Sequence, residues 1–215
     1  MKALIFDMDG VIFDSESIWE KAFKVANEKF SLSLTEKDRQ DCCGKEENQI
    51  RQELKAKYQF DVDQYRDFII DYVNDKINSH GAQLKEGFNQ LCYYCKDNNI
   101  KMALATSSKK DRALNLFKKA KMNAEEIFDF MVFSEDVKMG KPNPEIFIKA
   151  SEGVGEKPSD CIVLEDSING VVAAKNGGFN CIMVIDRIPP DETCKDFTMI
   201  VLDSLNDVKE FIANL

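Results

Sequence analysis

Short apolar segments recur along the chain, and most are separated by stretches with helical spacing. The strand-like segments are residues 4–6, 102–105, 130–133, 162–164, 182–184 and, more weakly, 199–202. Apolar positions at helical spacing predict helices at about 87–98, 109–120, 144–153 and 168–177. Strands that alternate with helices indicate an α/β fold with a doubly wound parallel sheet, covered on both faces. Such sheets bind their ligands at the C-terminal ends of the strands.

The segment from about residue 16 to residue 82 interrupts this alternation, because it has helical patterns and little strand signal. Its apolar positions at helical spacing begin with Ile18, Ala22 and Val25. A segment of this length is too long for one crossover helix between two parallel strands. We therefore predict a helical domain at 16–82, inserted into a core domain made of residues 1–15 and 83–215. The return linker should lie near Ser79-His80-Gly81.

Composition and charge narrow the class of protein. The 215 residues are 44% hydrophobic and 31% charged, which is typical of a soluble globular protein of one or two domains. The net charge of −9 argues against nucleic acid and anionic membranes as partners, although a local site can still bind a small anion. The chain starts directly with a strand and has no apolar run of about 20 residues. We therefore expect a cytoplasmic protein without a signal peptide or a membrane span.

The seven cysteines include a Cys92-x-x-Cys95 pair, a spacing that can serve redox or metal chemistry. Phe88, Leu91, Cys92 and Cys95 fall at helical spacing, however, and no second cysteine or histidine pair completes a zinc site. We interpret the pair as part of a buried helix face. The odd number of cysteines predicts reduced thiols. The only histidine, His80, is interpreted as a solvated loop residue.

Two of the predicted strands end in pairs of acidic residues. Asp7-Met8-Asp9-Gly10 follows the strand at 4–6, and Glu165-Asp166 follows the strand at 162–164. A turn at Gly10 would let Asp7 and Asp9 converge. Burying carboxylates is costly unless they are paired, hydrogen-bonded or bound to a cation. Taken alone, Asp-x-Asp-Gly is also typical of an ordinary acidic loop, but oxygen ligands clustered at adjacent strand ends favour Mg²⁺.

Two further segments could bind an anion at the same edge of the sheet. Thr106-Ser107-Ser108 follows the strand at 102–105, and the first backbone amides of the next helix have no intrahelical partner. Lys141 lies in Gly140-Lys141-Pro142-Asn143-Pro144, a loop that its two prolines stiffen. Ordinary helix capping and a solvated surface lysine also explain these two segments when each is taken alone.

The order of these motifs resembles that of the haloacid dehalogenase superfamily. Asp-x-Asp-Gly-Val, Thr-Ser-Ser, Gly-Lys-Pro-x-Pro and Glu-Asp-Ser follow one another along the whole chain. They are similar to those of the phosphatases and β-phosphoglucomutases that carry a helical cap after the first motif. The resemblance implies a Rossmann-like core, an inserted α-helical cap domain and a Mg²⁺ cofactor.

The resemblance also implies roles for the two acids of the first motif. Asp7 would be the nucleophile and a magnesium ligand. Asp9 would be the general acid and base, with its main-chain carbonyl on the metal. Asp7 is a useful nucleophile only when ionised, a state that a cation and Lys141 favour. Asp9 would donate a proton to the leaving alcohol and recover it from the water that cleaves the aspartyl-phosphate.

The other motifs supply the remaining site residues that the resemblance implies. Thr106, Ser107 and Lys141 would bind the phosphoryl group, where they would meet the charge that develops in the transition state. Asp166 would be a metal ligand. Glu165 would be a direct or a water-mediated ligand, and the motif leaves this open.

The choice within the superfamily rests on a few positions. Asp9 argues against a dehalogenase, because a departing halide needs no proton, whereas the alcohol of a phosphate ester does. β-Phosphoglucomutase is the main enzymatic alternative. In β-phosphoglucomutases, a histidine stands at the position that Trp19 occupies in this chain. An arginine of their cap stands at about the position of Glu47, which in this chain ends the run Cys43-Gly44-Lys45-Glu46-Glu47. An acid there would repel a second phosphate, although Lys45 could compensate, so the sequence favours a phosphatase.

We expect the substrate to be a small phosphorylated metabolite, most of all a sugar or polyol phosphate, because the helical insertion would cover the site. Glu16, Trp19 and Lys45 are the candidates for specificity. Trp19 could stack on a sugar face, although a tryptophan in a first helix more often packs in the cap core or the hinge. Ser17 and Glu20 match a capping box. We expect a monomer. The alternative outside the enzymes is a catalytically silent binding or regulatory protein, and the complete set of reacting residues argues against it.

Overall fold

The structure, a computed structural model, describes residues 1–42, 45, 47–187 and 189–215. Of the cap stretch singled out in the sequence, Cys43, Gly44 and Glu46 lie outside the described residues.

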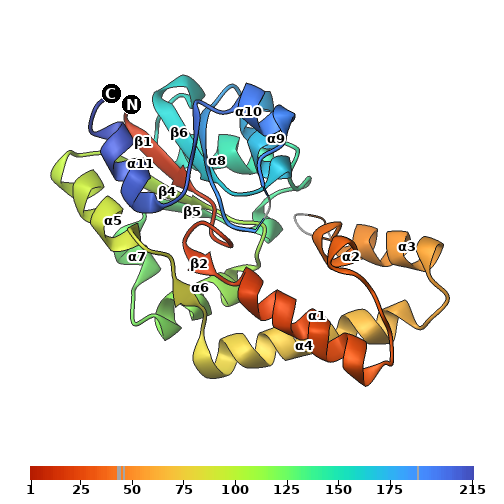
Figure 1. The fold of residues 1–215 in the computed structure, drawn as a ribbon. Helices are drawn as coiled ribbons and strands as arrows, with labels where there is room; N and C mark the ends of the chain where they lie inside the picture. The colour runs from red at the N-terminus through yellow and green to blue at the C-terminus, as the bar shows by residue number, and fades with distance from the viewer. Residues whose placement is uncertain (43–44, 46, 188) are drawn as a thin grey trace.

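Within the described residues, a six-stranded parallel sheet forms the centre of the fold (Figure 1), with the strand order β5-β4-β1-β6-β7-β8. The strands are β1 (Ala3–Phe6), β4 (Lys101–Ala105), β5 (Phe130–Val132), β6 (Cys161–Glu165), β7 (Asn180–Val184) and β8 (Ile200–Leu202). The six predicted strands are therefore confirmed, with ends that differ by one or two residues. Because β1 lies between β4 and β6, the motifs that follow these three strands meet at one edge.

Helices cover both faces of the sheet, because successive strand residues point to opposite sides. Leu4 and Phe6 pack with one group of helices, and Ala3 and Ile5 pack with the other. The first group is α5 (Phe88–Asp97), α6 (Lys110–Lys119), α7 (Ala124–Ile127) and α11 (Leu205–Ile212). The second group is α8 (Glu145–Gly153), α9 (Ile168–Asn176) and α10 (Glu192–Phe197). The doubly wound α/β fold is confirmed, as are the four predicted helices, which correspond to α5, α6, α8 and α9.

The segment predicted as an insertion is helical, and its helices lie beside the sheet (Figure 1). They are α1 (Glu16–Lys29), α2 (Glu36–Gln40), α3 (Glu47–Lys57) and α4 (Val62–His80). Two short strands, β2 (Phe13–Asp14) and β3 (Gln83–Leu84), pair antiparallel where the chain leaves and re-enters the core. This ribbon is the only strand pairing described between the two linkers. The boundaries of a separate domain stay a prediction.

Two local sequence interpretations are corrected by the structure. Ser17 and Glu20 do not form a capping box, because α1 begins at Glu16, two residues earlier than that motif requires, and its N-cap residue is Ser15. The Asp14 carboxylate accepts a hydrogen bond from the Ser17 amide at 3.2 Å, and Glu20 pairs with Lys24 at 2.5 Å. His80 is exposed as predicted, but it is the last residue of α4 and not part of a loop.

The cysteine interpretation is confirmed. Cys92 and Cys95 are buried on α5 together with Phe88 and Leu91. The six cysteines within the described residues are free thiols: Cys42, Cys92, Cys95, Cys161, Cys181 and Cys194. Among the described helices, none has the length and apolar character needed to cross a membrane.

Candidate active site

A tight loop after β1 sets the position of the first two acids. The amide of Phe13 donates to the carbonyl of Met8 at 3.0 Å, and the amide of Gly10 donates to the carbonyl of Phe13 at 2.9 Å. Gly10 has a φ of 83°, which disfavours side chains with a Cβ. A Cβ at Gly10 would also lie 2.1 Å from Oδ2 of Asp166. Glycine is required here because the loop passes directly against the acid that ends β6.

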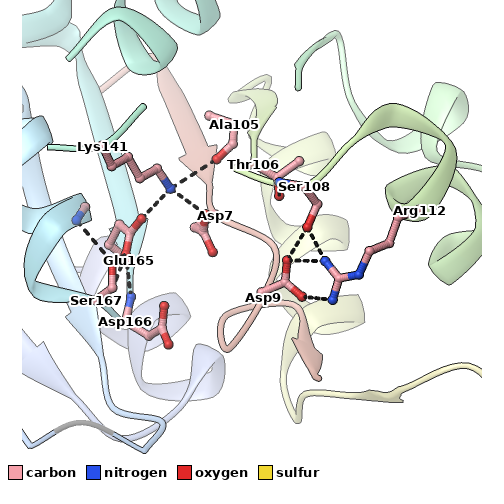
Figure 2. A network of polar contacts seen from close by, with 11 residues as sticks. Asp7, Asp9, Ala105, Thr106, Ser108, Arg112, Lys141, Glu165, Asp166 and Ser167 are labelled. Carbon is pink, nitrogen blue, oxygen red and sulfur yellow. Dashed lines mark hydrogen bonds and ion pairs between the residues drawn. The ribbon is translucent and has the colours of Figure 1, made fainter. Parts of the chain in front are cut away.

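Lys141 connects the acids of β1 and β6 (Figure 2). Its Nζ donates to Oδ1 of Asp7 at 2.5 Å and to Oε1 of Glu165 at 2.5 Å. It also lies 3.4 Å from the carbonyl oxygen of Ala105, at the end of β4. The Lys141 side chain is only 6% exposed. The alternative of a solvated surface lysine is therefore wrong, and the lysine links three strand ends.

Glu165 is held by the protein on both of its oxygens. Its Oε1 accepts a hydrogen bond from Nζ of Lys141. Its Oε2 accepts hydrogen bonds from the amides of Asp166 and Ser167, at 3.0 and 2.9 Å, and from the Ser167 hydroxyl at 2.9 Å. A Cβ at Gly170 would lie 2.0 Å from Oε1 of Glu165, so glycine leaves the room for this carboxylate. By contrast, within the described part of the chain the Asp166 carboxylate has no hydrogen-bond or ion-pair partner. Asp166 is thus the more available of the two as a ligand.

Asp9 is paired with an arginine that the sequence analysis missed. Arg112, on α6, donates to both oxygens of Asp9, with Nη2–Oδ1 at 2.8 Å and Nη1–Oδ2 at 2.9 Å. The hydroxyls of Ser15 and Ser108 donate to the same carboxylate at 2.5 and 2.7 Å. Figure 2 shows the Asp9 carboxylate turned toward Arg112, whereas Asp7 points toward Lys141. The spacing of the chain gives no signal of this pairing, because Ser108 precedes α6, which begins at Lys110, and the direction of Arg112 depends on how that helix packs.

The Thr-Ser-Ser segment contributes two of its three side chains to the site. Thr106 is fully buried, and its hydroxyl oxygen accepts a hydrogen bond from the Ser108 amide at 3.0 Å. Ser107 and Ser108 line the pocket, whereas Thr106 does not. The N-cap residue of α6 is Lys109, which makes no side-chain capping bond, so ordinary helix capping does not explain this segment.

Burial and paired charges shift the titration of the Asp7–Lys141 pair. Burial raises the pKa of Asp7 to about 8, since the opposing charge of Lys141 is partly offset by the charge of Glu165. Burial lowers the pKa of Lys141, but the charges of Asp7 and Glu165 outweigh this effect and raise it above its ordinary value. Asp7 therefore needs more positive charge than Lys141 alone supplies to be fully ionised at neutral pH.

The other two acids are shifted in opposite directions. Burial raises the pKa of Asp166 well above its usual value, and the charges of Glu165, Asp7 and Asp186 add to the rise. Burial also opposes ionisation of Asp9, but the charge and hydrogen bonds of Arg112 outweigh it and lower the pKa of Asp9 to about 2. Asp9 is therefore a carboxylate in this arrangement. It can act as an acid only after it separates from Arg112.

The acids open into a pocket of about 480 Å³ that lies between the sheet edge and the inserted helices. The three predicted specificity residues, Glu16, Trp19 and Lys45, all line it. Arg39 lies 3.3 Å from Glu16, and Lys45 pairs with Glu53 at 2.6 Å.

Glu47 also lines the pocket, but its charge is matched by neighbouring arginines. Arg66 donates to its two carboxylate oxygens at 3.0 and 2.7 Å, and Nε of Arg51 lies 3.0 Å from Oε1. The Arg66 guanidinium lies 5.9 Å from the ring centroid of Trp19. Glu47 is therefore part of a neutralised cluster, and the repulsion expected from an isolated acid is reduced.

The donor set at the sheet edge fits a hard divalent cation. Asp7 retains one carboxylate oxygen that Lys141 does not bind, the Asp166 carboxylate has no partner among the described residues, and Asp9 adds a main-chain carbonyl. No group of three or more His, Cys, Asp or Glu side chains in the described residues has the spacing of a metal site. Mg²⁺ does not need one, because it is usually held by one or two carboxylates and keeps several waters.

Fold and site together define a class of α/β proteins with an aspartate and a lysine at the C-terminal edge of a parallel sheet. The chain belongs to the haloacid dehalogenase-like hydrolase family, whose model matches residues 4–184.

Curated relatives carry phosphatase names. The chain is 34% identical over 188 residues to a phosphorylated carbohydrates phosphatase of Thermotoga maritima, covering 85% of this chain and 84% of that protein. It is 23% identical over 218 residues to hexitol phosphatase B of Escherichia coli, covering 98% and 94%. Among solved structures, β-phosphoglucomutase of Clostridium difficile is similar, with a TM-score of 0.79, 26% identity and coverage of 100% and 96%.

Proposed function

We propose that this protein is a magnesium-dependent phosphatase that hydrolyses small phosphomonoesters, most of all sugar or polyol phosphates. The observation that carries the proposal is the buried Asp7–Lys141–Glu165 arrangement at the base of a pocket that the inserted helices cover. The phosphatase names of the relatives from Thermotoga maritima and Escherichia coli support the same reaction class.

The geometry suggests how the chain's own residues would divide the reaction. The free oxygen of Asp7 attacks phosphorus, the bond between phosphorus and the leaving oxygen breaks, and an aspartyl-phosphate forms. Lys141 and the amides near Ser107 hold the phosphoryl oxygens. The leaving alcohol takes a proton from Asp9. A water then attacks phosphorus and gives a proton to Asp9, while the bond between phosphorus and the Asp7 oxygen breaks and inorganic phosphate leaves. Asp9 has to exchange Arg112 for the leaving group before the first of these proton transfers.

Asp7, the carbonyl of Asp9 and Asp166 are the groups that would hold Mg²⁺. The bound cation would supply positive charge that favours ionised Asp7 and offsets the charge of the phosphate. In this proposal Glu165 positions Lys141. Any contact of Glu165 with the metal goes through water, because other groups of the protein already donate hydrogen bonds to both of its carboxylate oxygens. We further propose that residues 16–82 form a cap that closes over the site, and that the protein acts as a cytoplasmic monomer.

β-Phosphoglucomutase chemistry is the second candidate, and one observation favours it. Arg66 and Arg51 neutralise Glu47, so the acid near the expected arginine position does not by itself exclude a second phosphate. In described residues, however, each of Arg39, Lys45 and Arg66 already has an acidic partner. A second phosphate that bound to any of these three side chains would have to displace its acidic partner.

The test is a phosphate-release screen over sugar phosphates, polyol phosphates and nucleotides, with Mg²⁺ and with a chelator. We expect magnesium-dependent release from a sugar or polyol phosphate, lost in Asp7→Asn, whose amide is nearly isosteric but a poor nucleophile. Release that persists in pure Asp7→Asn protein would refute the assignment. Faster conversion of β-glucose 1-phosphate to glucose 6-phosphate than phosphate release, with glucose 1,6-bisphosphate present, would identify a mutase instead.

A further inference from the structure

Asp186 is a buried carboxylate that none of the motifs includes. It follows β7 by two residues, and its side chain is 4% exposed. Its Oδ1 accepts a hydrogen bond from Nζ of Lys85 at 2.6 Å. Its Oδ2 is buried and has no hydrogen-bond partner within the described residues. An oxygen left in this state costs free energy, so the site requires a donor that the described chain does not supply.

The position of Asp186 indicates where that donor comes from. β7 lies directly beside β6, with Met183 opposite Glu165, so the loops that follow the two strands are neighbours. The next residue, Arg187, lines the pocket together with Asp166. Asp186 therefore follows the strand next to the one that leads to Asp166, and the residue beside it lines the same pocket as Asp166.

We propose that Asp186 is an outer-sphere ligand of the divalent cation, with Oδ2 accepting a hydrogen bond from a metal-bound water. This inference rests on the metal requirement of the proposed function. It explains the missing donor, because Mg²⁺ retains waters and acids behind the direct ligands commonly orient them. Lys85 fixes the carboxylate through Oδ1 and leaves Oδ2 for the water.

Lys85 also connects Asp186 to the linkers that carry the inserted helices. It directly follows β3, and its amide donates to the carbonyl of Ile12 at 2.8 Å, in the outgoing linker. Asp186 therefore joins the metal site to the ribbon where the inserted helices are attached. Arg187, beside it, lies 3.3 Å from Asp14 of β2. Consecutive residues after β7 thus pair with both linkers.

The experiment is a titration of the purified full chain with Mn²⁺, a spectroscopic substitute for Mg²⁺, followed by the electron paramagnetic resonance signal of free Mn²⁺. Asp186→Asn should weaken Mn²⁺ binding by about 10- to 100-fold, the usual effect of losing an outer-shell partner. Asp203→Asn is the matched control, because Asp203 is an exposed acid that follows the neighbouring strand β8. It should change the dissociation constant by less than twofold.

A second comparison covers the case in which Asp186→Asn leaves Lys85 unpaired and fails to fold. The double variant Lys85→Met/Asp186→Asn removes both charges, and it should bind Mn²⁺ about 10- to 100-fold more weakly than Lys85→Met alone. Equal binding in either comparison, or an equal loss in Asp203→Asn, would overturn the inference. If the unmodified chain bound no Mn²⁺ at all, both this inference and the metal requirement of the proposed function would be refuted. Normal Mn²⁺ binding without phosphatase activity would count against the proposed function alone.

Discussion

Replacement of Arg112 by methionine should lower the free energy of unfolding by an amount that depends on pH. Arg112 holds the pKa of Asp9 at about 2, against an ordinary value of 3.8. A shift of this size corresponds to about 2.5 kcal/mol of stability at neutral pH. Asp9 and Arg112 are 25% and 20% exposed, so solvent screens the pair only in part. The hydrogen bonds of Ser15 and Ser108 supply part of this shift and remain in the variant, so we expect a loss of about 1.5 to 2.5 kcal/mol at pH 7.

The sign of the pH dependence follows from the direction of the shift. Because the pKa of Asp9 is lower in the folded state, the pair stabilises the fold fully when the pH is above the pKa of Asp9 in the unfolded chain. This stabilisation disappears as the pH falls through the pKa of Asp9 in the folded state. The difference between the two proteins should therefore shrink to roughly half at pH 3. Urea unfolding followed by circular dichroism at pH 7 and pH 3 measures it. Lys195→Met, which removes an exposed ion pair with Glu192, is the control and should cost less than about 0.5 kcal/mol. A difference between Arg112→Met and the parent that is equal at both pH values would refute the reasoning.

Three other predictions concern Lys141, Gly170 beside the Glu165 carboxylate, and Trp19 in the pocket. Lys141→Met leaves the Asp7 and Glu165 carboxylates unpaired in a buried site, so we expect turnover to vanish and stability to fall by about 3 to 5 kcal/mol, measured by phosphate release and urea unfolding. Gly170→Ala places a Cβ 2.0 Å from Oε1 of Glu165, which should lower kcat at least tenfold with an unchanged circular dichroism spectrum; unchanged kcat would contradict the support role of Glu165. Trp19→Leu should raise KM for a polyol phosphate more than KM for 4-nitrophenyl phosphate, and equal changes would limit Trp19 to packing.

The sheet was predictable because its signals are local. Six short apolar segments, each followed by polar residues, are enough to place the strands, and the order of the motifs identifies the family. The ribbon of β2 and β3 was missed because each strand has two residues, too few to show a period. The capping box at Ser17 failed for a related reason. A hydrogen bond from its amide to Asp14 depends on where the chain leaves the loop after β1, which periodicity does not reveal.

The site was predictable only as far as strand ends determine it. Asp7, Lys141, Glu165 and Asp166 meet because β1 and β6 are neighbours and a stiff loop reaches over them. Arg112 was missed because its pairing with Asp9 depends on the rotation of α6 about its axis.

The neutralisation of Glu47 was also missed. Its partner Arg66 lies on another helix, α4, and the packing of two inserted helices is not encoded in the spacing of either one.

The most direct test of the account is detection of the covalent intermediate on Asp7. The protein would be mixed with Mg²⁺ and the best substrate from the screen, quenched in acid within the first turnover, reduced with borohydride and analysed by peptide mass spectrometry. Borohydride converts an aspartyl-phosphate to homoserine, so the account predicts homoserine at position 7, absent in the protein without substrate. Rapid phosphate release with unmodified Asp7, or with the modified residue at another position, would contradict it.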